Sequence, residues 1–174
     1  MERYYYHGFD HLGYEDGIKF MTNIILSGGI KTRNDVASLN DDSFEHVCLY
    51  KKNDDYDYSD EKNYYKSARY CYIDKCMSFV VSPSIDAERK VGSYIDEYRS
   101  IGNIPNSKIV GIAIPFEQIY NYSKELNPDG KKHLEELLKR LIDAATTFGF
   151  SIHNSDEENF TDKLDEQLNK QVNK

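Results

Sequence analysis

A histidine followed by a glycine, His7-Gly8, is the first pair of residues in the sequence that could hold a small molecule. The three tyrosines before it, at positions 4–6, favour an extended backbone, because bulky rings pack better on a pleated surface than in a helix. Glycine at the end of such a strand allows turns closed to other residues and lets another molecule approach closely. The pair therefore indicates a ligand-binding strand end; the alternative is a plain first strand whose histidine is hydrogen-bonded.

Two adjacent carboxylates, Asp96 and Glu97, lie in a stretch, residues 94–101, that we predict to be a strand. Successive side chains of a strand point to opposite faces, so a shift of one residue decides which acid faces a ligand. Glu97 shares its face with Arg99. The alternative for Glu97 is therefore a surface ion pair, which contributes little to stability.

The elements expected to position these residues are short strands around two clear helices. Apolar residues at helical spacing predict a helix from Tyr14 to Leu26, which Gly28-Gly29 ends. A second helix, from about Pro128 to Thr147, has Asn127 as its cap and Gly149 as its stop. The other predicted elements are strands at 46–50, 76–81, 108–114 and 150–153, and one or two helical turns within 86–91.

This pattern, with strands gathered in the first and last thirds of the chain, predicts an α+β fold with a mixed or antiparallel sheet. We expect one domain over residues 1–153 and a polar C-terminal tail over 154–174, which is at best a frayed helix. The acidic, tyrosine-rich segment 51–65 is expected to be a mobile loop that runs into a short helix. It is either a solvated insertion or a lid whose tyrosines offer stacking faces.

The composition narrows the class of protein. The chain has 174 residues, a net charge of -8 and a pI of about 5.1, whereas a nonspecific grip on nucleic acid needs a basic face. No apolar run approaches the roughly 20 residues of a membrane span, and the first residues contain no apolar signal-peptide region. The three cysteines, Cys48, Cys71 and Cys76, lack zinc-binding spacing. We expect reduced thiols, no metal site, no membrane partner and a cytoplasmic location.

A set of short motifs remains after the P-loop, the dinucleotide-binding glycine pattern, GxSxG and HExxH are found absent from the sequence. In order, they are His7-Gly8, a helix end at residues 25–30 (ILSGGI), a central strand ending at Ser82-Pro83, and Glu97 ahead of Ile104-Pro105. Their order and spacing resemble the ADP-ribosyltransferase superfamily. The resemblance is to its compact bacterial or phage members, which include the DNA-targeting toxins and the RNA 2'-phosphotransferase branch, and it covers roughly residues 4–114.

The resemblance implies a split antiparallel or mixed sheet with flanking helices and a cleft for NAD, the co-substrate, between its halves. His7 would hydrogen-bond the ribose on the adenosine side, and the Gly8 backbone would face the nicotinamide amide. Tyr50 or Phe79 would stack on the nicotinamide ring, and Ser82 would be a further contact at the end of a central strand.

Glu97 matches the catalytic glutamate of that family. Breaking the nicotinamide–ribose bond builds positive charge on the sugar, and a fixed carboxylate facing this charge lowers the barrier. The carboxylate could also help to deprotonate the acceptor. The arginines of the nucleic-acid-modifying branches are not evident, so we expect transfer of ADP-ribose to a protein or small-molecule acceptor, or to water.

A protein of another class also fits the sequence. A non-enzymatic acidic binding protein, of the immunity, antitoxin or phage-inhibitor type, would use its low pI and the acidic segment 51–65 to bind a basic partner. A third alternative is a relative that binds a nucleotide without turnover. Binding of NAD and release of nicotinamide distinguish the three.

Overall fold

The computed structural model describes residues 1–9, 13–33, 35, 45–90 and 94–172. Its strands are β1 (Tyr5–Phe9), β2 (Gly29–Ile30), β3 (Cys48–Tyr50), β4 (Met77–Val81), β5 (Ala87–Arg89), β6 (Glu97–Ser100), β7 (Ile104–Pro105), β8 (Ile109–Ile114) and β9 (Ser151–Asn154). Seven of them form one sheet in the order β5-β6-β3-β1-β4-β8-β9, and β2 pairs with β7. Within the described strands only β8 and β9 are parallel, which confirms an α+β fold with a mostly antiparallel sheet.

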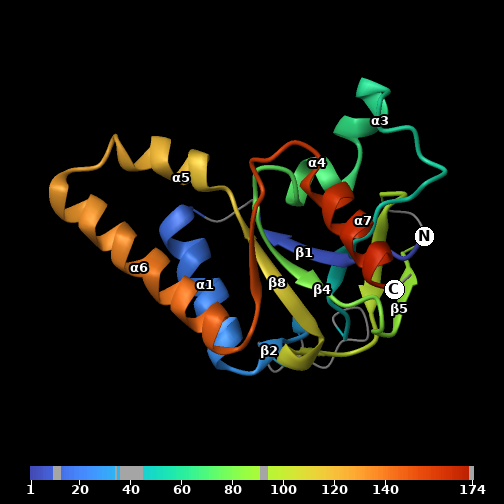
Figure 1. Ribbon diagram of the computed structural model, residues 1–174, viewed down its shortest axis with the longest axis horizontal. Helices are drawn as coiled ribbons and strands as arrows, with labels where there is room; N and C mark the ends of the chain where they lie inside the picture. Colours follow the sequence, from blue (N-terminus) through green and yellow to red (C-terminus); the bar gives the residue numbers. More distant parts are fainter. Residues whose placement is uncertain (10–12, 34, 36–44, 91–93, 173–174) are drawn as a thin grey trace.

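Helices cover both faces of the sheet (Figure 1). On one face lie α1 (Tyr14–Leu26), α5 (Phe116–Ser123) and α6 (Pro128–Thr147), and on the other lie α4 (Ala68–Tyr72) and α7 (Phe160–Val172). The short helix α3 (Glu61–Tyr65) projects from the body beside α4. Because both faces are covered, all five residues of the central strand β4 are buried.

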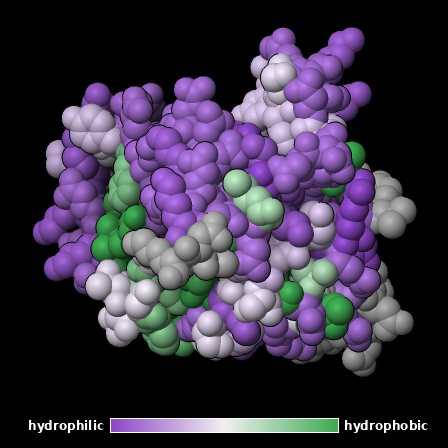
Figure 2. Space-filling model, turned by 45° about the vertical axis from the view of Figure 1, so that its right-hand side comes forward, coloured by the Kyte–Doolittle hydropathy of each residue, from purple (hydrophilic) through white to green (hydrophobic). Residues whose placement is uncertain are grey.

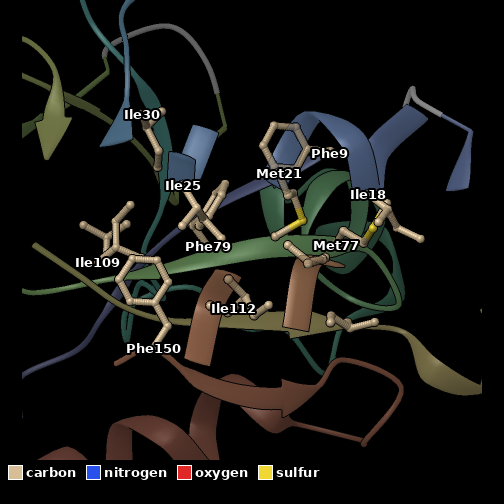
Figure 3. Close-up of a cluster of buried hydrophobic side chains, with 14 of the residues drawn as sticks. Phe9, Ile18, Met21, Ile25, Ile30, Met77, Phe79, Ile109, Ile112 and Phe150 are labelled. Carbon is tan, nitrogen blue, oxygen red and sulfur yellow. The ribbon is translucent and has the colours of Figure 1, made fainter. Parts of the chain in front are cut away.

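The larger apolar cluster lies between the sheet and α1 and α6. Figure 3 shows Phe9, Phe79 and Ile112 of the sheet pointing toward the same interior as Ile18 and Met21 of α1. Burial of this apolar surface, at roughly 25 cal/mol per Å², is the main driving force for folding. The cluster sets the position of α1, whose C-terminal end helps to form the site described below.

The two long predicted helices are confirmed. The first begins and ends at the predicted residues, and Gly28 and Gly29 follow it with positive φ. The second is capped as expected, because the Asn127 Oδ1 accepts a hydrogen bond from the Gly130 N–H at 2.7 Å. The helical turns predicted within 86–91 are wrong: residues 87–89 are the edge strand β5, and residue 91 lies outside the described residues.

The C-terminal region differs from the expected polar tail, because it contains strand β9 and helix α7. Phe160 and Leu164 pack on the second face of the sheet. The carboxylate of Asp165 accepts hydrogen bonds from the Tyr4 backbone N–H and the Arg3 guanidinium, both at 3.0 Å. Residues up to 172 therefore belong to the same folded body as the N-terminal strand.

The segment 51–65 ends in a short helix, as predicted, and its preceding turns are tied to the sheet. The Tyr58 hydroxyl accepts a hydrogen bond from the Asn53 N–H at 3.1 Å and donates one to the Asp96 carboxylate at 3.0 Å. The tyrosine ring therefore anchors the segment instead of offering a free stacking face.

Candidate functional site

The candidate site opens where strands β1 and β3 part. Between these two described strands the pairing is limited to Tyr6 opposite Tyr50, whereas β1 pairs with β4 along five residues. Beyond the Tyr6–Tyr50 pair, a side chain replaces the backbone pairing. The Nδ1 of His7 donates a hydrogen bond to the Cys48 carbonyl at 2.7 Å. A cavity of about 670 Å³ lies at this parting.

Glu97 is the one carboxylate among the described residues that line this cavity. It lies opposite Tyr50 on β3, which lies opposite Tyr6 on β1, so the three side chains point to the same face of the sheet. Its side chain is 11% exposed, and its Oε1 lies 3.5 Å from the Lys90 Nζ. His7 lies opposite Phe79 and so points to the other face, but both His7 and Glu97 line this cavity, because it opens where β1 and β3 part.

Asp96, the alternative acid, points elsewhere. It is fully buried, and its carboxylate accepts hydrogen bonds from the Ala68 N–H and the Tyr58 hydroxyl, both at 3.0 Å. Burial raises the pKa of Asp96 above its usual value. Its role is structural, because it holds the first turn of α4 against the sheet.

The His7 ring is a neutral hydrogen-bond acceptor at the cavity wall. Burial lowers the pKa of His7. Because a carbonyl can only accept, the bond to Cys48 places the ring proton on Nδ1 and leaves Nε2 unprotonated. Phe9 supports the ring in an edge-to-face contact, with 5.0 Å between the ring centroids. A hydroxyl of a bound sugar is a suitable donor to Nε2.

Gly8 lines the cavity, but contacts within the chain, and not a ligand, explain why only glycine fits at this position. A Cβ added there would lie 1.7 Å from the Tyr72 carbonyl oxygen at the end of α4. The close approach that requires glycine is therefore made by the chain's own backbone. Gly8 allows α4 to close one side of the cavity.

The predicted stacking residues are only partly at the site. Tyr50 lines the cavity and is 2% exposed, whereas Phe79 is fully buried in the apolar cluster on the other face. Ser82 is outside the lining, and its hydroxyl lies 2.8 Å from the Ser84 hydroxyl. Strand alternation explains the difference, since Phe79 points toward α1 and its neighbour Val80 toward the second face.

Three other aromatic rings line the cavity, and the sequence did not single them out. Phe20 of α1 and Tyr72 of α4 are 43% and 37% exposed, and Tyr94 lies 6.4 Å from Tyr72, centroid to centroid. Their partly exposed faces are suited to stacking on a planar ring. Tyr72 and Tyr94 were missed because neither falls in a motif.

The cavity also collects positive charge in an acidic protein. Lys31, Arg33 and Lys90 line it, and Glu97 is the acid among the described lining residues. With a net charge of -8 for the chain, this local excess of cations favours an anionic ligand. One sequence signal could have identified two of them, because Lys31 and Arg33 directly follow the Gly28-Gly29-Ile30 motif.

The thiol of Cys48 faces the same side of the sheet as Glu97. Burial, together with the charge of Glu97, raises the pKa of this thiol. A protonated thiol is a weak nucleophile, so we assign no covalent chemistry to it.

A pairing of two distant segments connects the walls of the site. Gly29 and Ile30 of β2 lie opposite Pro105 and Ile104 of β7. The Asn106 side chain donates to the Ile25 carbonyl at 2.8 Å, and its backbone N–H donates to the Gly28 carbonyl at 2.9 Å. The end of α1, next to Lys31 and Arg33, is thereby joined to the segment that follows Glu97.

No family model, no curated protein and no solved structure matches this chain. Within the described residues, no group of three or more histidine, cysteine, aspartate or glutamate side chains is placed to hold a metal ion. In the same part of the chain, every helix is too short or too polar to cross a membrane.

Proposed function

We propose that this chain is an NAD-consuming enzyme of the ADP-ribosyltransferase type, with the split-sheet fold of that superfamily. It cleaves the nicotinamide–ribose bond and transfers ADP-ribose to a protein or small-molecule acceptor, or to water. The observation that carries the proposal is the convergence of His7 and Glu97 on one cavity. Its volume of about 670 Å³ falls within the range of ligand sites.

The chemistry of the lining suits a dinucleotide. Lys31, Arg33 and Lys90 offer three positive charges to a pyrophosphate, and hydrogen bonds to charged groups are the strong ones. The exposed faces of Phe20 and Tyr72 suit the flat nicotinamide or adenine ring.

The roles of the two defining residues follow from their surroundings. The Glu97 carboxylate is almost enclosed and is held near Lys90, so it acts in a medium of low dielectric constant. There it stabilises the positive charge that develops on the ribose as nicotinamide leaves. Nε2 of His7 accepts a hydrogen bond from a sugar hydroxyl and orients the substrate, because its Nδ1 is already bonded to Cys48.

Release of nicotinamide from NAD by the wild type and by Glu97→Gln tests the proposal. We expect the variant to lose about 100-fold to 1,000-fold in rate, the usual effect of removing one electrostatic group from a reaction site. Glu88→Gln is the matched control, since Glu88 is exposed on the neighbouring strand β5 and lies outside the cavity lining. Equal release by wild type and Glu97→Gln would remove Glu97 from the mechanism.

Calorimetry with NAD separates the alternative classes. We expect heat of binding from the wild type and from Glu97→Gln. Heat without any release of nicotinamide would identify a nucleotide-binding protein without turnover. The absence of heat would leave the non-enzymatic acidic binding protein as the better interpretation.

A further inference from the structure

A second hollow lies on the outer side of α3 and α4, and we call it the tyrosine groove. It has a volume of about 880 Å³, and it runs between Tyr64, Tyr65 and Tyr70 on one side and the loop 155–159 on the other. Helix α4 separates it from the candidate active site, since Tyr70 lines the groove while Tyr72 lines the cavity. In Figure 2 the part of the molecule that projects at the upper right is coloured purple to white, so its residues are hydrophilic or of intermediate hydropathy.

The three tyrosines form a continuous aromatic platform. Their ring centroids are 4.8 to 5.7 Å apart, so the rings already touch and leave no space between them for a cation. Tyr65 and Tyr70 are nevertheless 50% and 46% exposed. Single exposed aromatics are ordinary on protein surfaces, but a packed group of them indicates an interaction site. The Arg69 guanidinium already lies over the Tyr64 ring, 6.0 Å from its centroid, and the exposed faces of Tyr65 and Tyr70 attract cations in the same way, arginine most of all.

The charge of the groove points to the same kind of occupant. Its lining holds five carboxylates against three cations: Asp74, Asp156, Glu157, Glu158 and Asp162 against Lys52, Arg69 and Lys75. Two of the cations are already engaged, Arg69 with Asp74 at 3.1 Å and Lys52 with Asp162 at 2.7 Å. Glu157 is also paired, with Lys163 outside the lining. Asp156 and Glu158 then remain against Lys75, and this negative excess repels nucleic acid and anionic lipid and favours a basic segment.

Two buried polar atoms in the lining have no hydrogen-bond partner among the residues that the structure describes. The Ser155 side chain is 2% exposed, and its Oγ has no hydrogen-bond partner within the described part of the chain. The same holds for the Asp156 Oδ1, although its Oδ2 accepts a hydrogen bond from the Glu117 N–H at 2.6 Å. Buried polar atoms are normally hydrogen-bonded, so these two acceptors await donors that a guanidinium or a peptide N–H can supply.

We propose that the tyrosine groove binds an arginine-containing, extended segment of a partner protein. The guanidinium planes lie on the tyrosine faces, and the guanidinium and backbone N–H groups donate to the carboxylates and to Ser155. The proposal does not depend on NAD chemistry, although docking here brings the partner next to the candidate active site across α4.

Fluorescence anisotropy with a short labelled peptide of alternating arginine and glycine tests this binding, in the absence of NAD. The wild type is expected to bind the peptide and to bind it more weakly as salt is raised. Tyr65→Ala combined with Tyr70→Ala is expected to weaken binding about tenfold, the sum of two exposed cation–π contacts. Glu158→Lys is expected to weaken it as well, by reversing a charge of the groove.

The matched control is Tyr120→Ala, which removes a tyrosine 63% exposed on α5, outside the groove lining. It should bind like the wild type, and thermal melts should show all variants folded. Equal binding by wild type and the double tyrosine variant would overturn the proposal, as would no binding by the wild type. Equal binding of a glutamate–glycine peptide would overturn it too. Because the binding assay contains no NAD, its outcome does not depend on whether the chain releases nicotinamide from NAD.

Discussion

The two faces of the sheet bury different kinds of side chain. The face under α1 and α6 is packed almost entirely with aliphatic and aromatic side chains, among them Phe79 and Leu141. The face under α4 and α7 has a smaller apolar cluster and buries ionisable groups such as Arg69, Asp96 and Asp165. The tyrosine groove is formed by elements on this second face, whereas the cavity is lined from both faces, by Phe20 of α1 as well as by Tyr72 of α4. The first face thus supplies most of the apolar packing, and the second holds most of the buried ionisable groups.

The buried charges on the second face reduce the stability of the folded protein. Burial raises the pKa of Asp165 to about 6, even though Arg3 and the Tyr4 N–H act in the opposite direction. A group whose pKa is raised in this way is less favourable as an anion in the folded protein than in the unfolded chain. Such groups weaken the fold at neutral pH, so the apolar face has to compensate for them.

Phe79→Ala should have the largest effect on stability. Removing a fully buried ring from the apolar face is expected to lower the free energy of unfolding by about 3–5 kcal/mol, measured by denaturant titration. Phe20→Ala, at the partly exposed cavity rim, should cost about 1 kcal/mol but weaken NAD binding. If folded Phe79→Ala lost affinity for NAD while Phe20→Ala kept it, the division between a stabilising interior and a ligand-binding cavity rim would be contradicted.

Gly8→Ala should have the next largest effect. Its Cβ would collide with the Tyr72 carbonyl, so α4 or β1 must shift, at an expected cost of about 1–3 kcal/mol in unfolding free energy. Gly13→Ala is the control, because an added Cβ there meets nothing within 4 Å. Thermal melts of both variants check the difference. Similar melting temperatures would show that α4 moves aside for the added Cβ without a loss of stability.

Lys90→Gln sharpens the comparison on the polar side. It removes a cation from the cavity and the partner of Glu97, and we expect the KM for NAD to rise about tenfold while the stability changes little. Lys108→Gln is the control, since the Lys108 Nζ donates to the Ser84 hydroxyl outside the cavity. Steady-state nicotinamide release gives both values. An unchanged KM in Lys90→Gln would place the anion of the ligand elsewhere.

The smallest expected effect is a pH dependence from His7. Burial lowers the pKa of His7 in the folded protein, so below the unfolded pKa of about 6.5 the unfolded chain binds the proton more readily. The contribution of His7 to the free energy of unfolding is therefore fully present above the unfolded pKa and is lost as the pH falls toward the folded pKa. Unfolding free energies at about pH 7.5 and 5.5 should differ less in His7→Gln than in the wild type.

His153 also has a lowered pKa through burial, but it is present in both proteins and cancels in the comparison. The same loss of stability in both proteins at the lower pH would show that His7 titrates alike in the folded and unfolded chain.

Elements with strong local signals were predictable from the sequence. Helix α1 combines helical spacing of apolar residues with a glycine stop, and its bounds match the prediction. Helix α5 was missed because it is short and buries little besides Ile119. Helix α7 was taken for a tail because its composition is polar. Its buried polar contact is between Asp165 and the N-terminal residues Arg3 and Tyr4, a long-range pairing that local patterns do not reveal.

The lining of the candidate site was predictable where a motif marks it and not where packing decides. His7, Gly8 and Glu97 were found from motif order, and all three line the cavity. Phe79 lies outside the cavity lining, and its direction could not be predicted because both faces of β4 are buried, so the strand carries no alternation of apolar and polar residues. Lys90 follows strand β5 and Tyr94 precedes strand β6, and their place in the cavity lining depends on how these strands pair in the folded chain.

The pairing of Gly29 with Pro105 makes the wall of the cavity at Lys31 and Arg33 dependent on a residue that lines no part of the cavity. A Cβ at position 29 would lie 2.2 Å from the Ile104 carbonyl oxygen, so a larger residue would push the two segments apart. The cavity wall would then change shape although every residue that lines it remained the same. On the proposed function, impaired turnover without any substitution in the lining is the expected result of such a change at this junction.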